Sequence, residues 1–303
     1  MELVRSFGVL ALLFLLPAGH VAAQHFVSYW PQYRGADINA VKGVTHLHYA
    51  FGEVDESGEL QTPQNLSVLR AVRAAGYASG ARPGLLLGGW NGGDDRHLTK
   101  AMSSSESRSR LALSVAKFLR REQLAAVEID WEYPDSVRQG EHLQSFLAEL
   151  RSELEPDDIN IGLSVPALGV HADMIPTEVF NYIDVLSVMA YDNIGSTHAS
   201  REFFQASLDY WVARGAPPKI IAMGIPAYSR PEARTFRQLV VADKRNAWRD
   251  SDGIDNWNGI PTVRWKANLA SQYGAGLMLW ELGQDSPAPT SIALTLANEI
   301  VDQ

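Results

Sequence analysis

The feature that most constrains the fold of this chain is a regular alternation between two hydrophobic patterns. Short apolar runs rich in β-branched and aromatic residues recur along the chain, and between them the apolar residues are spaced about 3.6 residues apart. Such alternation predicts parallel strands joined by helices. The predicted strands, eight in number, are His25–Tyr29, Thr45–Phe51, Gly84–Leu87, Ala126–Trp131, Ile159–Val165, Val185–Ala190, Ile220–Ile225 and Gly276–Trp280.

This number of strand and helix units favours a closed barrel over an open sheet. The units fit the α/β class and a single (β/α)8 TIM barrel, which takes about 250 residues. A doubly wound open sheet often carries a glycine-rich phosphate loop, but the chain contains neither G-x-G-x-x-G nor G-x-x-x-x-G-K-[ST]. The glycine-rich segment 88–93 is interpreted instead as a tight turn from strand to helix. Helical spacing is clearest in Leu111, Val115, Phe118 and Leu119, and in Phe203, Leu208, Trp211 and Val212.

The first 23 residues have the pattern of a secretory signal peptide. Arg5 precedes a ten-residue apolar run, Phe7–Leu16, and small residues follow at 21–23. Ten apolar residues are about half of the roughly 20 that span a bilayer, which disfavours a transmembrane helix. We expect cleavage near Ala23, a secreted or periplasmic location, and no membrane span in the mature chain. The mature domain is expected to cover 24–303, about 280 residues.

Composition excludes several classes of protein. Lys and Arg total 26 and Asp and Glu 35, a formal net charge of −9, whereas nucleic-acid binding needs clustered basic residues. The chain contains no cysteine, so disulfides, thiolate nucleophiles and cysteine-ligated zinc are excluded. Hydrophobic residues make up 46% of the chain, enough to bury a large core. We expect a globular monomer with no nucleic-acid partner.

Three acidic residues alternate along the fourth predicted strand. Successive side chains on a strand point to opposite faces, so Glu128, Asp130 and Glu132 share one face. These acids are expected to point into the barrel or its mouth, where burial and mutual repulsion raise carboxyl pKa values, as a general acid requires. An edge strand with a solvated acidic face is the alternative, although acids are depleted in strands. The residues expected to face the helices are Val127, Ile129 and Trp131.

A metal site is a competing interpretation of the same acids. Glu128 and Glu132 lie about 13 Å apart along a strand, so one ion cannot easily gather all three carboxylates. The histidines form no His-Glu-x-x-His or similar ligand pattern. His46 and His48 alternate on the second predicted strand, and either a position at the mouth or a satisfied interior position fits them. We predict no metal site, and a metal-dependent barrel enzyme stays a minor alternative.

Segment 125–134 resembles D-G-x-D-x-D-W-E-Y-P, the signature of family 18 glycoside hydrolases, the chitinases and their relatives. Further matches follow in family order on other predicted strands, so the resemblance covers essentially the whole mature chain. They are Tyr29-Trp30, Tyr49-Ala50-Phe51, Leu86-Leu87-Gly88-Gly89-Trp90 (S-x-G-G-W in the family), Met189-Ala190-Tyr191-Asp192 (M-x-Y-D/N), Gly224-Ile225-Pro226-Ala227-Tyr228 (G-I-P-x-Y) and Trp280-Glu281-Leu282 (W-E-L).

The resemblance implies a role for each residue at the mouth of the barrel. Glu132 would protonate the glycosidic oxygen while the substrate's own 2-acetamido carbonyl attacks the anomeric carbon, which retains configuration without a protein nucleophile. Asp130 would orient the acetamido group, and Glu128 would share charge or a proton with Asp130. Tyr191 would hydrogen-bond the acetamido oxygen, and Trp280 would form an apolar floor under the sugar. The other implied sugar-binding residues are Tyr29, Trp30, Phe51, Gly89, Trp90, Met189, Asp192 and Tyr228.

The implied reaction is hydrolysis of β-1,4-linked N-acetylglucosamine polymers, chitin or chito-oligosaccharides, without a cofactor. The implied partner is a polysaccharide or oligosaccharide with 2-acetamido sugars. The core motifs fit equally an endo-β-N-acetylglucosaminidase or a hydrolase of peptidoglycan-type glycans from the same family. A non-catalytic chitin- or glycan-binding lectin on the same barrel is the alternative from another class. Family lectins typically lose the terminal acid, which this chain keeps as Glu132.

Three departures from the family pattern surround the acids. Ala125-Ala126 stands in place of Asp-Gly, Glu128 in place of the innermost Asp, and Leu86 in place of the third-strand Ser. All lie in or near the expected barrel interior, so the polar network that supports Asp130 must differ. A longer acid beside an apolar residue is expected either to repack this region or to displace Asp130.

Other conspicuous residues have structural interpretations. Trp211 and Trp265 fall in helical patterns and are expected to pack in the core, whereas Trp248 and Trp257 fit either the core or outer sugar subsites. Glu281 is expected to pair with an arginine.

The connection between the last two predicted strands is short. Long members of the resembled family insert a small α+β domain there, but residues 228–276 must also supply a helix near Thr262–Tyr273. We therefore predict the short form without the insertion domain, with a loop and little more before that helix. Without the insertion domain the substrate groove lacks one wall. We therefore predict an open groove that favours cleavage of internal bonds of the polymer.

Overall fold

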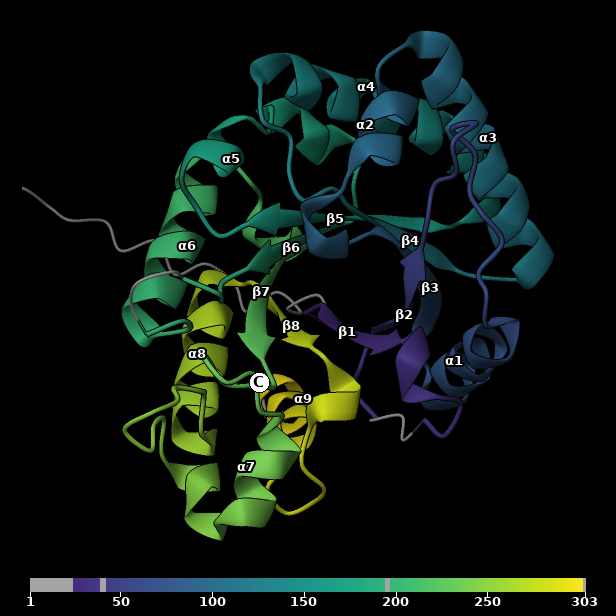
Figure 1. Cartoon of the computed structure of the whole chain (residues 1–303). Coiled ribbons are helices and arrows are strands. Elements are labelled where there is room, and N and C mark those ends of the chain that lie inside the picture. The colour runs from purple at the N-terminus through teal and green to yellow at the C-terminus, as the bar shows by residue number, and fades with distance from the viewer. Residues whose placement is uncertain (1–23, 39–41, 194–196, 302–303) are drawn as a thin grey trace, which may run out of the picture.

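The structure, a computed structural model, describes residues 24–38, 42–193 and 197–301, so the predicted signal peptide lies outside the described residues. Within these ranges the strands form a closed parallel barrel in chain order, surrounded by helices (Figure 1). The predicted α/β fold, a (β/α)8 barrel, is confirmed. The strands are β1 (Phe26–Pro31), β2 (His46–Gly52), β3 (Arg82–Gly88), β4 (Ala126–Asp130), β5 (Asn160–Pro166), β6 (Val185–Met189), β7 (Ile221–Pro226) and β8 (Gly276–Trp280).

The predicted strands coincide with the observed ones, and their ends differ by no more than two residues. Neighbouring strands pair in parallel around the ring, and β1 closes it against β8 with Phe26 opposite Leu277. Because the strands are parallel, all their carboxyl ends meet at one mouth of the barrel. Cis peptide bonds near this mouth are Ala50–Phe51, Glu132–Tyr133 and Trp280–Glu281.

The helices form the outer layer around the strands (Figure 1), and their buried apolar side chains belong to the main core. In α3 the predicted apolar face is buried. In α6 the predicted Leu208 and Trp211 are buried, but Phe204 is buried in place of the predicted Phe203, because Phe204 lies four and seven residues before them and so shares their helix face. The helices are α1 (Leu66–Ser79), α2 (Arg96–Met102), α3 (Ser105–Glu122), α4 (Val137–Leu154), α5 (Val170–Asp173), α6 (Arg201–Ala213), α7 (Phe236–Ala242), α8 (Ile260–Tyr273) and α9 (Ile292–Val301).

The tryptophans outside the mouth divide between core and surface. Trp211 is fully buried, as predicted. Trp265 is half-buried on α8 under the guanidinium of Arg201, 5.3 Å from its ring centre. Trp257 is 1% exposed and belongs to the core, whereas Trp248 is 55% exposed. Of the two tryptophans whose surroundings the sequence left open, Trp248 and Trp257, only Trp248 therefore presents its ring to solvent.

The connection between β7 and β8 contains more structure than the sequence predicted. Besides α8, it forms α7 and the 3-10 helix Lys244–Trp248. The prediction of a loop and little more was wrong here, because Thr235 and Gln238 form a capping box that starts α7.

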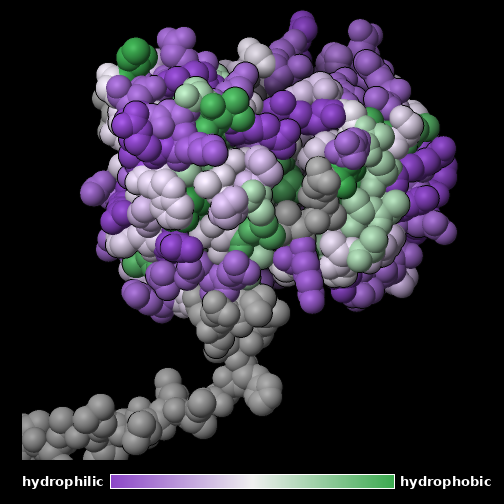
Figure 2. All heavy atoms as spheres, turned by 90° about the horizontal axis from the view of Figure 1, so that it is seen from below, coloured by the Kyte–Doolittle hydropathy of each residue, from purple (hydrophilic) through white to green (hydrophobic). Residues whose placement is uncertain are grey.

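The surface is mixed in character. In the view from below, hydrophobic side chains lie in small groups among hydrophilic ones (Figure 2). Among the described residues, no helix combines the length and the apolar character needed to cross a membrane.

Two buried acids fix the chain after β8. Glu281 pairs with Arg34 at 2.7 Å, which confirms the predicted arginine partner. Asp285 is 4% exposed and accepts hydrogen bonds from the backbone N–H groups of Ile292 and Ala293 at 2.8 and 2.9 Å. It also accepts one from Ser291 Oγ at 2.6 Å. Asp285 thus satisfies the free donors at the start of α9 and ties this last helix to the end of the barrel.

Replacing Asp285 with alanine leaves these buried donors without an acceptor. We expect the free energy of unfolding to fall by about 2–3 kcal/mol, measured by urea denaturation followed by tryptophan fluorescence. The control is Glu141→Ala on α4, which removes an exposed acid and should change this free energy much less. Equal losses in both variants would contradict the anchoring role of Asp285.

Candidate active site

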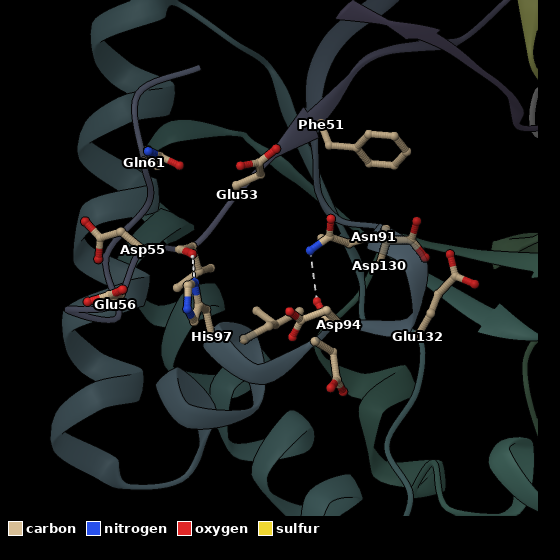
Figure 3. Close-up of a pocket in the computed structure, with 15 residues that line it drawn as sticks. Phe51, Glu53, Asp55, Glu56, Gln61, Asn91, Asp94, His97, Asp130 and Glu132 are labelled. Atoms are coloured by element: carbon tan, nitrogen blue, oxygen red, sulfur yellow. Dashed lines mark hydrogen bonds between the residues drawn. The ribbon is translucent and has the colours of Figure 1, made fainter. Parts of the chain in front are cut away.

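The carboxyl ends of β2, β3 and β4 border a cavity of about 530 Å³ (Figure 3). Phe51 from β2, Gly88 from β3 and Asp130 from β4 line it, together with Glu132 just beyond β4. Active sites of (β/α)8 barrels lie at this end, because the loops that follow the strands meet there. The cavity has the size of a small-ligand site, and two of the three predicted acids border it.

The three acids lie at different depths. Glu128 is fully buried, and Asp130, the last residue of β4, is 4% exposed. Glu132 is half-buried on the segment after the strand. The prediction that one regular strand carries all three acids was wrong for Glu132, because β4 and its pairing with β3 end at Asp130. The predicted apolar set does pack in the main core: Val127, Ile129 and Trp131.

Glu128 is held by hydroxyl groups from β1 and β5. Its Oε1 accepts hydrogen bonds from Tyr29 Oη at 2.8 Å and from Ser164 Oγ at 2.7 Å, and His48 Nε2 lies 3.5 Å from its Oε2. Burial raises the pKa of Glu128, and the hydrogen bonds from Ser164 and Tyr29 oppose the increase. A Cβ at Gly162, its register partner on β5, would lie 2.9 Å from Glu128 Cγ. Glycine at this position therefore makes room for the acid.

His46 and His48, for which the sequence left two positions open, both lie inside the barrel. They are 4% and 2% exposed, and their stacked rings are 6.1 Å apart between centroids. His46 Nε2 lies 3.1 Å from Asn160 Oδ1, whereas His48 Nδ1 has no hydrogen-bond partner among the described residues. Burial lowers the pKa of His48 well below its ordinary value, so the ring is neutral. Within the described ranges, no group of three or more His, Asp or Glu residues is arranged to hold a metal ion.

The departures at Leu86 and Glu128 are opposite one another on neighbouring strands. Leu86 is the register partner of Glu128 and is 1% exposed. It packs with Tyr29 in a small apolar cluster inside the barrel. Since the Leu86 side chain offers no hydrogen bond, the hydrogen bonds to Glu128 come from the hydroxyl groups of Tyr29 and Ser164, both to Oε1, and Oε2 has no partner among the described residues. The interior is therefore packed around the longer acid, and Asp130 keeps its place at the end of β4.

Asp130 is buried with one carboxyl oxygen, Oδ1, unpaired within the described residues. Burial raises its pKa well above the ordinary value, and the charges of Glu132 and Glu128 add to the increase. Its backbone oxygen accepts a hydrogen bond from Gly89 N at 2.8 Å, and a Cβ at Gly88 would collide with that oxygen. The backbone thus positions a carboxyl group that has hydrogen-bonding capacity left for a ligand.

Glu132 has the properties of a general acid. Burial raises its pKa to about 7. A hydrogen bond from Tyr133 opposes the increase, and the negative charge of Asp192 adds to it. A carboxyl group with this pKa is partly protonated at neutral pH and holds a proton that it can give to a leaving group.

Aromatic rings from β1, β2 and β8 lie together at the mouth. The ring centre of Trp280 is 5.0 Å from that of Tyr29 and 5.7 Å from that of Phe51. Trp280 and Phe51 are half-buried, so part of each ring is open. Phe51 reaches this position because Gly89, with a φ of +97°, has no Cβ to block its ring. The rings offer an apolar surface of the kind on which sugar rings pack.

A second polar cluster follows β6. Asp192 accepts hydrogen bonds from Tyr228 Oη at 2.8 Å and from Arg230 Nε and Nη2 at 2.7 and 2.9 Å. Burial would raise the pKa of Asp192, but interactions with His198, Arg230 and Tyr228 outweigh it and hold the pKa below its ordinary value. Tyr191 lies edge-on to Tyr228, 6.3 Å between ring centres. Asp192 is therefore a fixed anion beside the mouth.

The remaining candidates lie in different surroundings. Trp30 is 6% exposed, packs in the main core and donates its indole N–H to Gly35 O at 2.7 Å. Trp90 is 58% exposed and is not among the residues that line the cavity. Met189 is half-buried against the apolar cluster inside the barrel.

Sequence reasoning missed two residues of the site. Ser164 alternates with the buried residues Leu163 and Val165 on β5, and this polar position on the inner face was a usable signal. Arg230 carried no comparable signal, because only the folded chain brings it to Asp192.

A family model for glycosyl hydrolases family 18 matches residues 24–285, which include all the strands of the barrel. The chain belongs to this family. A family 18 relative, probable chitinase 2 of Drosophila melanogaster, is 29% identical over 178 residues, which cover 51% of this chain and 35% of that protein. Alignments with this and four other curated relatives span between 12% and 62% of those proteins' own lengths.

Solved structures share this barrel fold. The GH18 chitinase ChiB from the chitin utilization locus of Flavobacterium johnsoniae superposes with a TM-score of 0.81 at 25% identity, over 92% of this chain and 94% of that one. A chitinase-like agglutinin from Robinia pseudoacacia has a TM-score of 0.78 at 19% identity, over 90% of this chain and 98% of that one. The second likeness shows the fold alone.

The charge of Asp192 offers a test of the electrostatics around Glu132. Because this charge raises the pKa of Glu132, Asp192→Asn should lower that pKa and leave the carboxyl ionised at a lower pH. We expect the Glu132 carboxyl carbon to titrate near pH 7 in the wild type and at lower pH in the variant, followed by NMR. The surface change Asp243→Asn should leave the titration in place. An unshifted Asp192→Asn curve would show that Glu132 does not sense this charge.

Proposed function

We propose that this protein hydrolyses polymers of β-1,4-linked N-acetylglucosamine, chitin or chito-oligosaccharides, by a retaining mechanism in which the substrate takes part. The observation that carries the proposal is the pair of acids after β4. Asp130 is buried with a free oxygen, and burial raises the pKa of Glu132 to about 7. Membership of a glycosyl hydrolase family supports the reaction class, and relatives named as chitinases support the substrate class.

In the first step, Glu132 gives its proton to the glycosidic oxygen as the bond from that oxygen to the anomeric carbon breaks. The carbonyl oxygen of the 2-acetamido group attacks the anomeric carbon from the opposite face, and an oxazolinium ion forms. In the second step, Glu132, now a carboxylate, takes a proton from water while the water oxygen attacks the anomeric carbon and opens the ring. Two inversions leave the product with its original configuration, and no protein nucleophile is needed.

Asp130 would accept a hydrogen bond from the acetamido N–H and turn the carbonyl oxygen toward the anomeric carbon. Its unpaired Oδ1 supports this assignment. Burial and neighbouring acids raise the pKa of Asp130, which means that they destabilise its anionic form. The positive charge that develops on the oxazolinium stabilises this anion, so the interaction between the two is strongest at that stage of the reaction. Glu128, deeper in the barrel, would share charge with Asp130 while Tyr29 and Ser164 hold it.

Tyr191 and the aromatic rings would complete the sugar site. Tyr191 Oη lies 3.8 Å from Met278 Sδ, a weak acceptor, so little is lost when this hydroxyl turns to the acetamido oxygen. Trp280, with Phe51 and Tyr29 against it, would support the apolar face of the reacting sugar.

Other functions on the same barrel differ in what they require. A lectin needs no proton donor, and the retained Glu132 with its raised pKa favours an enzyme. An endo-β-N-acetylglucosaminidase or a hydrolase of peptidoglycan-type glycans uses the same acetamido chemistry and differs in the product. The signal-like N-terminus supports export to the medium or the periplasm, where we propose that the protein acts as a monomer and cleaves internal bonds.

Loss of the proton at residue 132 is the direct test. Glu132→Gln keeps the shape of the side chain but cannot donate a proton, so we expect kcat on N-acetylglucosamine oligomers to fall by about 100-fold or more. Products are measured by chromatography that separates anomers, and the wild type should release the β-anomer first. Glu141→Gln, an exposed change on α4, should retain wild-type activity.

Two results would overturn the proposal. Chitin binding by the wild type with no turnover above that of Glu132→Gln would identify a lectin. Initial release of the α-anomer would exclude the retaining mechanism.

A further inference from the structure

One side of the cavity is strongly acidic. Beyond Asp130 and Glu132, carboxylates line it as far as Glu56, and no Lys or Arg is among the lining residues that the structure describes. In Figure 3 the two catalytic candidates lie at one end, Asp55 and Glu56 lie at the other, and Glu53 and Asp94 lie between them. We call this side the acidic arm, and its residues are Glu53, Asp55, Glu56, Asp94 and Asp95.

Internal contacts neutralise only part of the arm. Asp94 pairs with Arg96 at 2.6 Å, and Asp95 accepts hydrogen bonds from Trp131 Nε1 at 2.6 Å and Thr99 Oγ1 at 3.0 Å. Asp55 accepts hydrogen bonds from the backbone N–H and the hydroxyl group of Ser57 at 2.8 and 2.5 Å. In contrast, the carboxylates of Glu53 and Glu56 are exposed, and neither makes a hydrogen bond or ion pair with a described residue.

The nearest cations do not balance the arm. Arg96 is committed to Asp94, and Lys100 donates to the backbone oxygen of Glu56 at 3.0 Å rather than to a carboxylate. His97 Nδ1 lies 3.1 Å from Val54 O. A ligand in the arm therefore meets an excess of negative charge.

The arm joins directly onto the reactive end of the cavity. Asp130 lines the same cavity, is 4% exposed and has an oxygen without a partner among the described residues. The exposed carboxylates of Glu53 and Glu56 thus line the same cavity as a buried acceptor that has no partner among the described residues.

We propose that the acidic arm binds sugar residues whose 2-amino group is free and protonated, so that the preferred substrate is partly deacetylated chitin. This inference rests on the proposed function, because an N-acetylated residue must still lie at Asp130 and Glu132. A neutral N-acetylglucosamine unit can only donate hydrogen bonds to an unpaired carboxylate, whereas the ammonium group of a glucosamine unit also gains an ion pair. Glycans with carboxylate substituents, as in peptidoglycan, are repelled by the same charges.

The substrate ratio of an arm variant tests the proposal. In Glu53→Gln/Glu56→Gln we expect kcat/KM on partly deacetylated oligomers, relative to fully acetylated oligomers of the same length, to fall by about fivefold. The control is Glu141→Gln/Glu153→Gln on α4, two exposed acids whose removal changes the net charge equally. Its ratio should match that of the wild type.

Salt should act on the same ratio. The Debye length shortens from about 30 Å at 0.01 M to about 8 Å at 0.15 M salt, so the wild-type preference for deacetylated oligomers should decline over this range. In the arm variant the decline should be smaller.

The sequence of the products is a second measurement. Nonspecific attraction of a cationic oligomer to the acidic protein does not alter it. Because the arm extends to one side of Glu132, mass-spectrometric sequencing should find glucosamine enriched on one side of the cleaved bond, and less so in the arm variant. Equal ratios in the wild type, arm variant and control, or glucosamine on both sides alike, would overturn the proposal.

Failure of the reaction and failure of the arm can be separated. If the wild type does not cleave fully acetylated oligomers, the proposed function fails. The arm is then tested by calorimetric titration of glucosamine oligomers. Binding that is weaker in the arm variant than in the control supports the arm, and equal binding overturns it.

Discussion

Burial of several carboxyl groups at the end of one strand is the constraint on which the rest of this structure depends. A buried acid must be hydrogen-bonded, paired or protonated, because an isolated charge is costly away from water. Tyr29 and Ser164 hydrogen-bond one oxygen of Glu128, and burial raises the pKa values of Glu128, Asp130 and Glu132 alike. The cost of burial is thereby turned into the proton affinity that acid catalysis requires.

Glycines on neighbouring strands make the space for this arrangement. A Cβ at Gly84 would collide with the His48 ring, and one at Gly162 would crowd Glu128. Each glycine is the register partner of the residue it accommodates. The network around the longer acid at position 128 thus depends on β2, β3 and β5 as well as on β4. Opposite the apolar Leu86, Glu128 keeps hydrogen bonds to Oε1 alone, and its Oε2 has no partner among the described residues.

The sequence predicted the fold well because strand and helix periodicities are local. Strand ends were placed within two residues, and the acids of β4 were assigned to the inside of the barrel. The errors, and the positions that the sequence left open, are found where tertiary contacts decide. Packing against the barrel selected Phe204 over its neighbour, and Trp257 went to the core because Asn246 O accepts its indole N–H. Burial of Trp30 likewise depends on a contact with Gly35 that no periodicity reveals.

By itself, the sequence determined the barrel, the order of its strands and the acids that face its interior, since side-chain alternation follows from backbone geometry alone. Only the tertiary structure decided what those acids contact and how charged their surroundings are. Glu128 meets Tyr29 across 99 positions of sequence, and Asp192 meets Arg230 across 38. The acidic arm brings the segment after β2 together with the loop after β3. Such contacts exist only after the ring of strands closes, because closure fixes which distant segments share the same side of the mouth.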